Sequence, residues 1–202
     1  MDTFEVEAKW ELNYAQYILL QDFMLSIESK RTNGYDMFFE NPFLHEKHLL
    51  RFRPRPDGTG FITVKKLVAP YIRRENEIKL SNKNNKKEIV AFLDDIGYEY
   101  NKSIIKSGFS IEHLRLGDKQ YHVALYLATH KEKVRYFLEL EMDKTYVNHK
   151  NPYDSAEILK ENCHKLFSDT LKGLLSEEEV VLCDKLLYEY FWSWQVSRTE
   201  VY

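Results

Sequence analysis

The sequence predicts an α+β fold in which seven or eight antiparallel strands close into a barrel covered by helices. First, charged and apolar residues alternate with a two-residue period along several segments. Second, turn signals such as Pro56-Asp57-Gly58 join neighbouring strands as hairpins. Third, segments with helical spacing lie between the strands and at the end of the chain, an order typical of α+β folds. This number of strands favours closure into a barrel.

Length and composition indicate one domain over residues 1–202, with the barrel over about 3–143 and C-terminal helices over about 155–195. Hydrophobic residues make up 44% of the chain, enough for a core. The net charge of −3 hides a basic middle, because residues 47–87 hold 12 Lys and Arg against 3 acids. Such a stretch predicts a polyanionic ligand.

Several classes of protein are disfavoured by the sequence. The N-terminus lacks a secretion signal, and no stretch of about 18 apolar residues is present, so we expect a cytoplasmic protein without a membrane segment. Cys163 and Cys183 have no zinc spacing and are expected to be reduced core thiols. The lysines near residue 86 are expected to form a solvated helix entrance, so nucleic acid is not the expected partner.

The expected elements follow from hydrophobic period, caps and breakers. Strands are expected at residues 3–12, 35–40, 49–54, 61–67, 71–80, 103–106, 121–129 and 135–143, and the segment 108–116 is a candidate for a further strand. Helices are expected at 14–28 with Asn13 as cap, at 86–96 with Gly97 as C-cap, and from 155 onward, where a capping box at 176–179 precedes an amphipathic helix over 180–194.

The apolar stripe of that last helix has two interpretations. Its members are Leu186, Leu187, Tyr190, Phe191 and Trp194. The stripe is either a homodimer face or the side that packs on the barrel, and we expect the packing role, with Trp10 anchoring the same contact.

Five of the strands place charged or polar side chains on one face and mostly apolar ones on the other. The charged faces carry Glu5, Glu7 and Lys9; Arg51 and Arg53; Thr63 and Lys65; Arg73, Glu75 and Glu77; and Glu139 and Glu141. Acids lie on the first and last strands and bases on the middle ones. Arginine forks suit phosphate oxygens, and neighbouring carboxylates suit a divalent metal.

For a single strand, a solvated outer face is the simpler explanation. For the whole set, the apolar faces need cover, and the predicted helices can supply it on the outside of the barrel. The charged faces would then point inward, where charges are costly unless an ion and a ligand neutralise them. The sequence therefore predicts an interior site for a polyanion bridged by metal.

The ordered motifs resemble those of the CYTH superfamily, the triphosphate tunnel metalloenzymes. The similarity covers about residues 3–143 and is carried by Glu5-x-Glu7-x-Lys9, Leu50-Arg51-Phe52-Arg53, Thr63-Val64-Lys65, Arg73-Arg74-Glu75-Asn76-Glu77, Ile104-Ile105-Lys106 and Glu139-Leu140-Glu141. The resemblance implies a closed antiparallel eight-stranded barrel, a tunnel that binds a small-molecule triphosphate with Mg²⁺ or Mn²⁺.

The resemblance also implies a role for each matching residue. Metal ligands would be Glu5, Glu7 and one or both of Glu139 and Glu141, and phosphate ligands would be Lys9, Arg51, Arg53, Lys65, Arg73 and Lys106. Glu75 and Glu77 would hold metal or orient water and the basic groups, and the catalytic set would be Glu5, Glu7, Lys9, Glu75 and Glu77.

The chain departs from the family pattern in two places. Ser107 and Gly108 stand where an Arg usually follows Lys106, and Tyr126 is the nearest match to a usual Asp, with Arg115 or His122 as substitutes. Three functions remain open at this point, and the first is the one we expect. The first is triphosphate hydrolysis, the second is cyclisation of ATP to cyclic AMP with release of pyrophosphate, and the third is binding of polyphosphate or nucleotide without turnover.

Overall fold

The structure, a computed structural model, describes residues 3–41, 49–81, 86–183 and 185–191. Nine strands occur among these residues: β1 Thr3–Leu12, β2 Lys30–Glu40, β3 Leu49–Pro54, β4 Gly60–Ala69, β5 Ile72–Leu80, β6 Glu99–Leu116, β7 Lys119–His130, β8 Lys133–Met142 and β9 Val181–Leu182. The α-helices there are α1 Tyr14–Ser26, α2 Lys86–Asp95 and α3 Pro152–Lys165.

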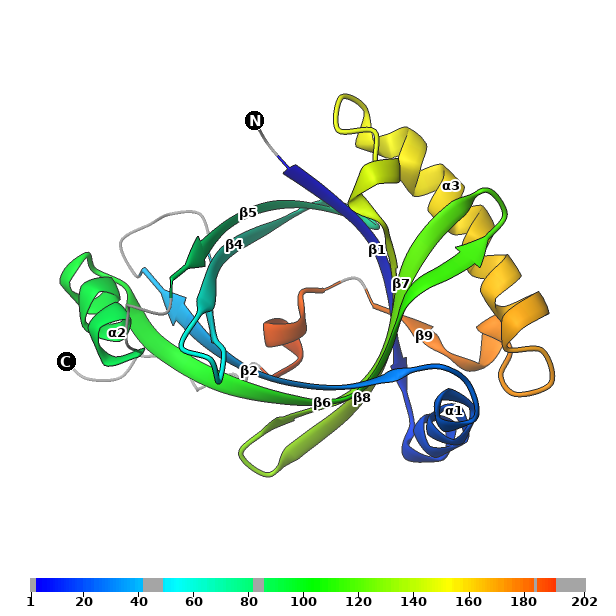
Figure 1. The fold of residues 1–202 in the computed structure, drawn as a ribbon, viewed down its shortest axis with the longest axis horizontal. Helices are drawn as coiled ribbons and strands as arrows, with labels where there is room; N and C mark the ends of the chain where they lie inside the picture. The colour runs from blue at the N-terminus through cyan, green and yellow to red at the C-terminus, as the bar shows by residue number, and fades with distance from the viewer. Residues whose placement is uncertain (1–2, 42–48, 82–85, 184, 192–202) are drawn as a thin grey trace, which may run out of the picture.

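Eight of these strands form the closed antiparallel barrel that the sequence predicts. The sheet order is β5-β4-β3-β2-β6-β7-β8-β1, and pairing of β1 with β5 closes the ring. Figure 1 shows this ring with α1, α2 and α3 outside it. The described part of the chain contains no helix long and apolar enough to cross a membrane.

The helices cover the outward apolar faces of the strands, as expected. On one side, α1 and α3 pack with outward residues of β1, β7 and β8 in the largest hydrophobic cluster. There the Trp10 ring meets the Phe167 ring edge-on, with centroids 5.1 Å apart. The expectation that Trp10 anchors the stripe that begins at Leu186 is wrong, because Leu187 and Phe191 belong to a different cluster. On the other side, Ile89 and Leu93 of α2 pack on β2 and β3. Covering these faces leaves the opposite faces to line the barrel interior.

The predicted caps of the first two helices are present. The Asn13 side chain accepts a hydrogen bond from the backbone N–H of Gln16, and the Gln16 side chain accepts one from the backbone N–H of Asn13. Gly97 follows α2 with a φ of +85°, a left-handed conformation that favours glycine. Cys163 and Cys183 are buried free thiols.

The separate strands expected at 103–106 and 108–116 are one continuous strand, β6. Gly108, which lies within β6, marks a close approach of β6 to β7. A Cβ atom built at Gly108 would lie 2.0 Å from the carbonyl oxygen of Leu125, and glycine is the residue that permits such an approach inside a strand.

The amphipathic helix expected over 180–194 is wrong for the described part of that segment. Val181–Leu182 forms β9, which pairs with Trp10 and Glu11 of β1, and Leu187–Phe191 forms a short 3₁₀ helix. Trp194 lies outside the described residues. The 3₁₀ helix, drawn in orange-red, lies within the ring of strands in Figure 1. The stripe therefore packs on the barrel from inside rather than from outside.

The inserted segment fills one end of the barrel with apolar side chains. Leu187 and Phe191 are 8% and 1% exposed and cluster with Phe38, Ile104 and Phe137 of the inner wall. The Lys102 ammonium donates a hydrogen bond to the carbonyl oxygen of Phe191, 3.3 Å away. We call residues 185–191 the plug, because they close this end of the tunnel.

Candidate functional site

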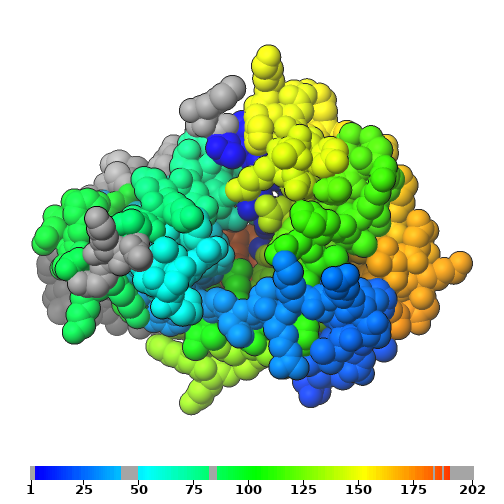
Figure 2. All heavy atoms as spheres, in the orientation of Figure 1, coloured from blue at the N-terminus to red at the C-terminus, as the bar shows by residue number. Residues whose placement is uncertain are grey.

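All twelve residues selected from the sequence line one cavity inside the barrel. The cavity has a volume of about 930 Å³, and its wall includes eight Lys and Arg and seven Asp and Glu side chains. Leu186 and Leu187 of the plug also line it and form its floor. Figure 2 shows a hollow between the strands at the opposite end, where the orange-brown plug is visible in the depth. We call this cavity the chamber.

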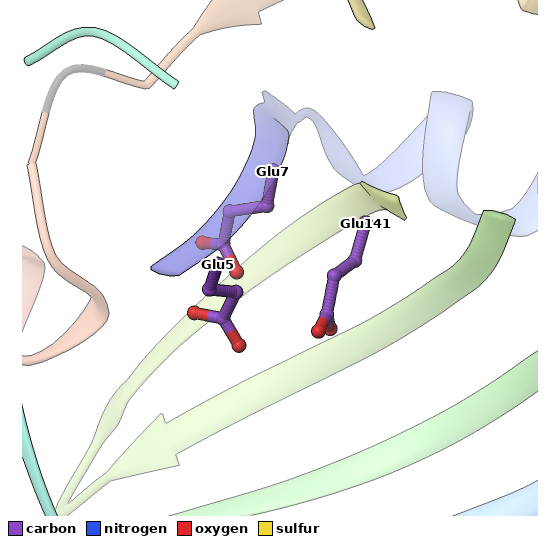
Figure 3. A group of neighbouring side chains, drawn as sticks. All are labelled: Glu5, Glu7 and Glu141. Atoms are coloured by element: carbon purple, nitrogen blue, oxygen red, sulfur yellow. The ribbon is translucent and has the colours of Figure 1, made fainter. Parts of the chain in front are cut away.

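Three carboxylates converge on one point of the chamber wall. Glu5 and Glu7 come from β1 and Glu141 from β8, where Glu7 and Glu141 are directly opposite each other in the ladder. One oxygen of each lies within 4.8 Å of the others, and Figure 3 shows the three side chains directed toward one another. Glu5 and Glu7 are each 5% exposed. Such a compact set of hard oxygen donors suits Mg²⁺ or Mn²⁺.

The carboxylates differ in how well the protein itself neutralises them. Burial raises the pKa of Glu5, and burial with repulsion from Glu5 and Glu7 raises the pKa of Glu141 well above its usual value. For Glu7, burial acts the same way but is outweighed by Arg73 and Lys9, so its pKa lies well below the usual range. The Lys65 ammonium, 2.5 Å from Glu5, compensates that carboxylate only in part, and the charge that Glu5 and Glu141 carry in their ionised forms would be neutralised by a divalent cation at this point.

A second carboxylate cluster organises basic side chains instead. Glu75, 4% exposed, lies 3.4 Å from the Lys65 ammonium, 3.8 Å from the Arg51 guanidinium and 3.2 Å from the Lys144 ammonium. Glu77 lies 3.8 Å from the same arginine. These contacts place the basic groups side by side along the wall, with Glu75 as their common partner.

Asp36 is a chamber residue that the sequence reasoning missed. It is 0% exposed, and its two oxygens accept hydrogen bonds from Nε and Nη2 of Arg53 at 2.5 and 2.8 Å. Burial opposes its charge, but the bonds to Arg53 hold the pKa of Asp36 below its usual value. The sequence feature that could have indicated Asp36 is a single acid inside an otherwise apolar segment, on the same face of the strand as Phe38.

Deeper in the chamber, a chain of polar contacts links β1, β8 and β7. The Lys9 ammonium lies 2.8 Å from Glu139 and 3.3 Å from Glu7. The Tyr126 hydroxyl donates a 2.5 Å hydrogen bond to Glu139, and the Lys106 ammonium lies 4.5 Å from the centroid of the Tyr126 ring. Burial opposes ionisation of Glu139, yet Lys9 and Lys106 lower its pKa to about 2. Glu139 is therefore neutralised by protein groups and lies outside the cluster of Glu5, Glu7 and Glu141.

The two departures from the family pattern have a physical explanation. The close approach at Gly108 leaves no room for an arginine, and the ring of Tyr126 occupies the adjoining wall. Of the two substitutes, Arg115 is exposed and bonds to the carbonyl oxygen of Gly117. His122 lines the chamber, with Nδ1 4.0 Å from Glu141. Histidine, and not Arg115, is thus the residue that joins the site.

Comparisons by sequence identify no relative. No family model matches the chain, and no curated protein matches it.

Comparisons by structure find many similar chains, with low identity. PH1819 from Pyrococcus horikoshii OT3 has a TM-score of 0.63 and 18% identity, covering 93% of this chain and 97% of that one. HpAC1 from Hippeastrum, a candidate adenylyl cyclase with a dominant triphosphatase activity, has a TM-score of 0.62 and 12% identity, covering 95% of each chain. A candidate adenylate cyclase, bh2851 from Bacillus halodurans, has a TM-score of 0.60 and 15% identity, covering 95% of this chain and 99% of that one.

The chain shares its closed-barrel fold with these structures. Because the similarity extends over nearly the whole length of both partners in each pair, the fold expected from the motifs is confirmed. At these identities the likeness concerns the fold, and the chemistry of this tunnel has to be argued from its own residues.

Proposed function

We propose that this chain is a Mg²⁺- or Mn²⁺-dependent hydrolase that cleaves the terminal phosphoanhydride bond of a triphosphate. The observation that carries the proposal is the enclosed chamber, in which a cluster of three carboxylates adjoins a wall of lysine and arginine. Neither group is favourable in a buried cavity alone, and a metal with a phosphate chain complements both.

Glu5, Glu7 and Glu141 are the residues that would hold the metal. When bound, the ion would supply positive charge that stabilises the phosphoryl group during transfer. Glu139 was also a metal-ligand candidate, but its contacts with Lys9 and Tyr126 favour a different role, in which it orients that lysine.

The basic side chains would bind and orient the phosphate chain. Arg53, with Nε and Nη2 held by Asp36, keeps its Nη1 amino group for a phosphate oxygen. Arg51 has a buried Nε atom with no hydrogen-bond partner in the described structure, as expected of a group that awaits an anion. Lys65 and Lys106 complete the wall, and Arg73, tied to Glu7, stabilises the carboxylate cluster.

The proposed reaction needs only water as the second reactant. A water oxygen bonds to the terminal phosphorus, the bond from that phosphorus to the bridging oxygen breaks, and the diphosphate part leaves with the bonding electron pair. A carboxylate of the chamber wall accepts the proton of the attacking water. Glu75 and Glu77, expected from the sequence to orient water, are the candidates for this role. The products are orthophosphate and the shortened phosphate chain.

Cyclisation of ATP is the second candidate, because HpAC1 and bh2851 are both described as adenylyl cyclase candidates. The test is to incubate the purified chain with Mg²⁺ or Mn²⁺ and either tripolyphosphate or ATP. Release of orthophosphate supports hydrolysis. Release of pyrophosphate and cyclic AMP in equal amounts from ATP would instead support cyclisation. Binding without any turnover would leave the chamber as a polyphosphate- or nucleotide-binding module.

Variants of the chamber test the assignment of roles. Glu5→Gln, Glu7→Gln and Arg53→Ala should each lower turnover by at least ~100-fold, the scale of losing a group that stabilises transition-state charge. Glu11→Gln is the matched control, because Glu11 lies on the same strand as Glu5 and Glu7 but pairs with Arg135 outside the chamber. Full activity in all three chamber variants would refute the proposed site.

A further inference from the structure

We propose that Tyr126 is a positioning residue of the chamber, whose ring holds Lys106 ready for phosphate and whose hydroxyl fixes Glu139. The inference rests on the proposed triphosphate hydrolysis and assigns a role to the aromatic residue that replaces an expected acid. Tyr126 is 4% exposed on the inner face of β7 and lines the chamber.

Lys106 differs from the other basic residues of the predicted set. Lys9, Arg51, Arg53, Lys65 and Arg73 each have a carboxylate oxygen within 4.0 Å. Within the described structure Lys106 has no such partner, and its ammonium lies over the Tyr126 ring instead.

An aromatic ring attracts a cation through its negative face without accepting a strong hydrogen bond. A carboxylate at the same place would engage the N–H groups of Lys106 and compete with a phosphate oxygen. The ring therefore fixes the direction of the lysine and leaves its three N–H donors for the ligand. The ring of Phe137 lies beside that of Tyr126, with centroids 5.5 Å apart, and does not itself line the chamber.

Charged groups from four other strands also face Lys106. Glu139 on β8 and Asp36 on β2 favour its charged form, while Arg53 on β3 and Lys9 on β1 oppose it. Burial is the largest influence and, with the two opposing cations, outweighs the two carboxylates, so that the pKa of Lys106 is lowered to about 8. The ammonium form thus predominates at pH 7, and a phosphate oxygen beside it would raise the pKa again.

The hydroxyl of Tyr126 acts on a second lysine. It donates to Glu139, which also receives the Lys9 ammonium at 2.8 Å. Removing the hydroxyl should change the orientation of Lys9 through Glu139, whereas removing the ring should release Lys106. The two functions of Tyr126 are therefore separable by substitution.

The experiment compares Tyr126→Phe with Tyr126→Leu, using tripolyphosphate and Mg²⁺ as the probe. Tyr126→Leu should raise KM about tenfold, an effect of the size of one cation–π contact. It should also shift the alkaline limb of the pH profile of KM, that is, the pH above which KM rises, away from its wild-type value near pH 8. Tyr126→Phe should keep KM and that limb while lowering kcat. In a Lys106→Met background, Tyr126→Leu should have no further effect on KM.

Phe137→Leu is the control for a purely structural role, because Phe137 packs on Tyr126 without lining the chamber. It should leave KM and its pH profile unchanged. If Tyr126→Leu misfolds, the kinetics of Tyr126→Phe and the pH dependence of KM in Lys106→Met still test the proposal. Two results together would overturn the role of Tyr126 and leave the proposed function standing. They are an equal change of KM in Tyr126→Leu and Phe137→Leu, and a change of KM on adding Tyr126→Leu to Lys106→Met that equals its change in the wild type. A wild-type chain that hydrolyses no triphosphate would overturn the proposed function and this inference together.

Discussion

Replacing Glu141 with glutamine should stabilise the metal-free protein while removing its response to metal. The pKa of Glu141 in the folded chain lies well above its usual value, because of burial and of repulsion from Glu5 and Glu7. The folded state therefore binds more protons than the unfolded state between the two pKa values. Stability contributed by the protonated carboxyl is lost as the pH rises through that window, and at pH 8 Glu141 weakens the fold.

The size of the effect follows from the linkage between pKa and stability. Each pKa unit corresponds to about 1.4 kcal/mol, and the side chain of Glu141 is 25% exposed, so solvent screening is incomplete. For a chain of this size about 1 kcal/mol shifts Tm by roughly 2–4 °C. The raised pKa of Glu141 therefore predicts that Glu141→Gln raises Tm at pH 8 in the absence of metal, by roughly 2–4 °C for each kcal/mol of destabilisation that the substitution removes.

Metal should stabilise the wild type much more than the variant. At a concentration of about 100 Kd, Mn²⁺ would stabilise the wild type by about 2.7 kcal/mol, which is roughly 5–11 °C in Tm. The variant, with one of three ligands neutralised, should show little of this gain. Thermal melts at pH 8 with and without MnCl₂ measure both effects, with Glu11→Gln as the control that keeps the metal response. A variant that melts lower than wild type without metal and gains as much from Mn²⁺ would refute the reasoning.

Three further predictions test other parts of the chamber and barrel. Asp36→Ala should destabilise the fold by about 3 kcal/mol, because it leaves Arg53 without its buried partner, and denaturant titration measures the loss. Gly108→Ala should lower Tm strongly, because its Cβ would lie 2.0 Å from a backbone oxygen of β7. Gly34→Ala is the control and should be tolerated, because its Cβ would lie 3.9 Å from the nearest atom. Equal Tm values for the two variants would contradict this. Because the plug closes one end of the tunnel, the wild type should not cleave polyphosphate whose two ends are blocked as phosphoramidates, whereas Leu187→Ala should cleave it. Gel analysis of the polyphosphate chain length measures this cleavage. Internal cleavage of the blocked polyphosphate by the wild type would exclude a closed floor.

The barrel was predictable from sequence because two-residue alternation is a direct consequence of strand geometry. Along β1, Glu5, Glu7 and Lys9 share a face whatever their neighbours are, and the same holds for Glu139 and Glu141 on β8. The need to cover the opposite faces with helices then decided which side is the interior. All twelve candidate residues consequently line one cavity.

The C-terminal segment was not predictable by the same means. Leu186, Leu187, Tyr190 and Phe191 have helical spacing, which is compatible with a short 3₁₀ helix as well as a long α-helix. Their surroundings are the apolar inner end of the barrel, which forms only when eight strands close. Period alone carries no information on whether a stripe packs inside or outside.

Contacts between side chains on different strands also could not be predicted from the sequence. Asp36 looked like an isolated acid because its partner Arg53 lies on another strand, and the two meet only in the register of β2 with β3. Tyr126 looked like a departure from a pattern until its contacts with Glu139 and Lys106 were visible.

The most direct test of the central claim is a crystal structure of the chain soaked with tripolyphosphate and Mn²⁺, with the ion located by anomalous scattering. A manganese peak among Glu5, Glu7 and Glu141, with phosphate oxygens on Arg53 and Lys106, is the predicted result. Manganese or phosphate bound only outside the barrel, with the chamber holding neither, would contradict it.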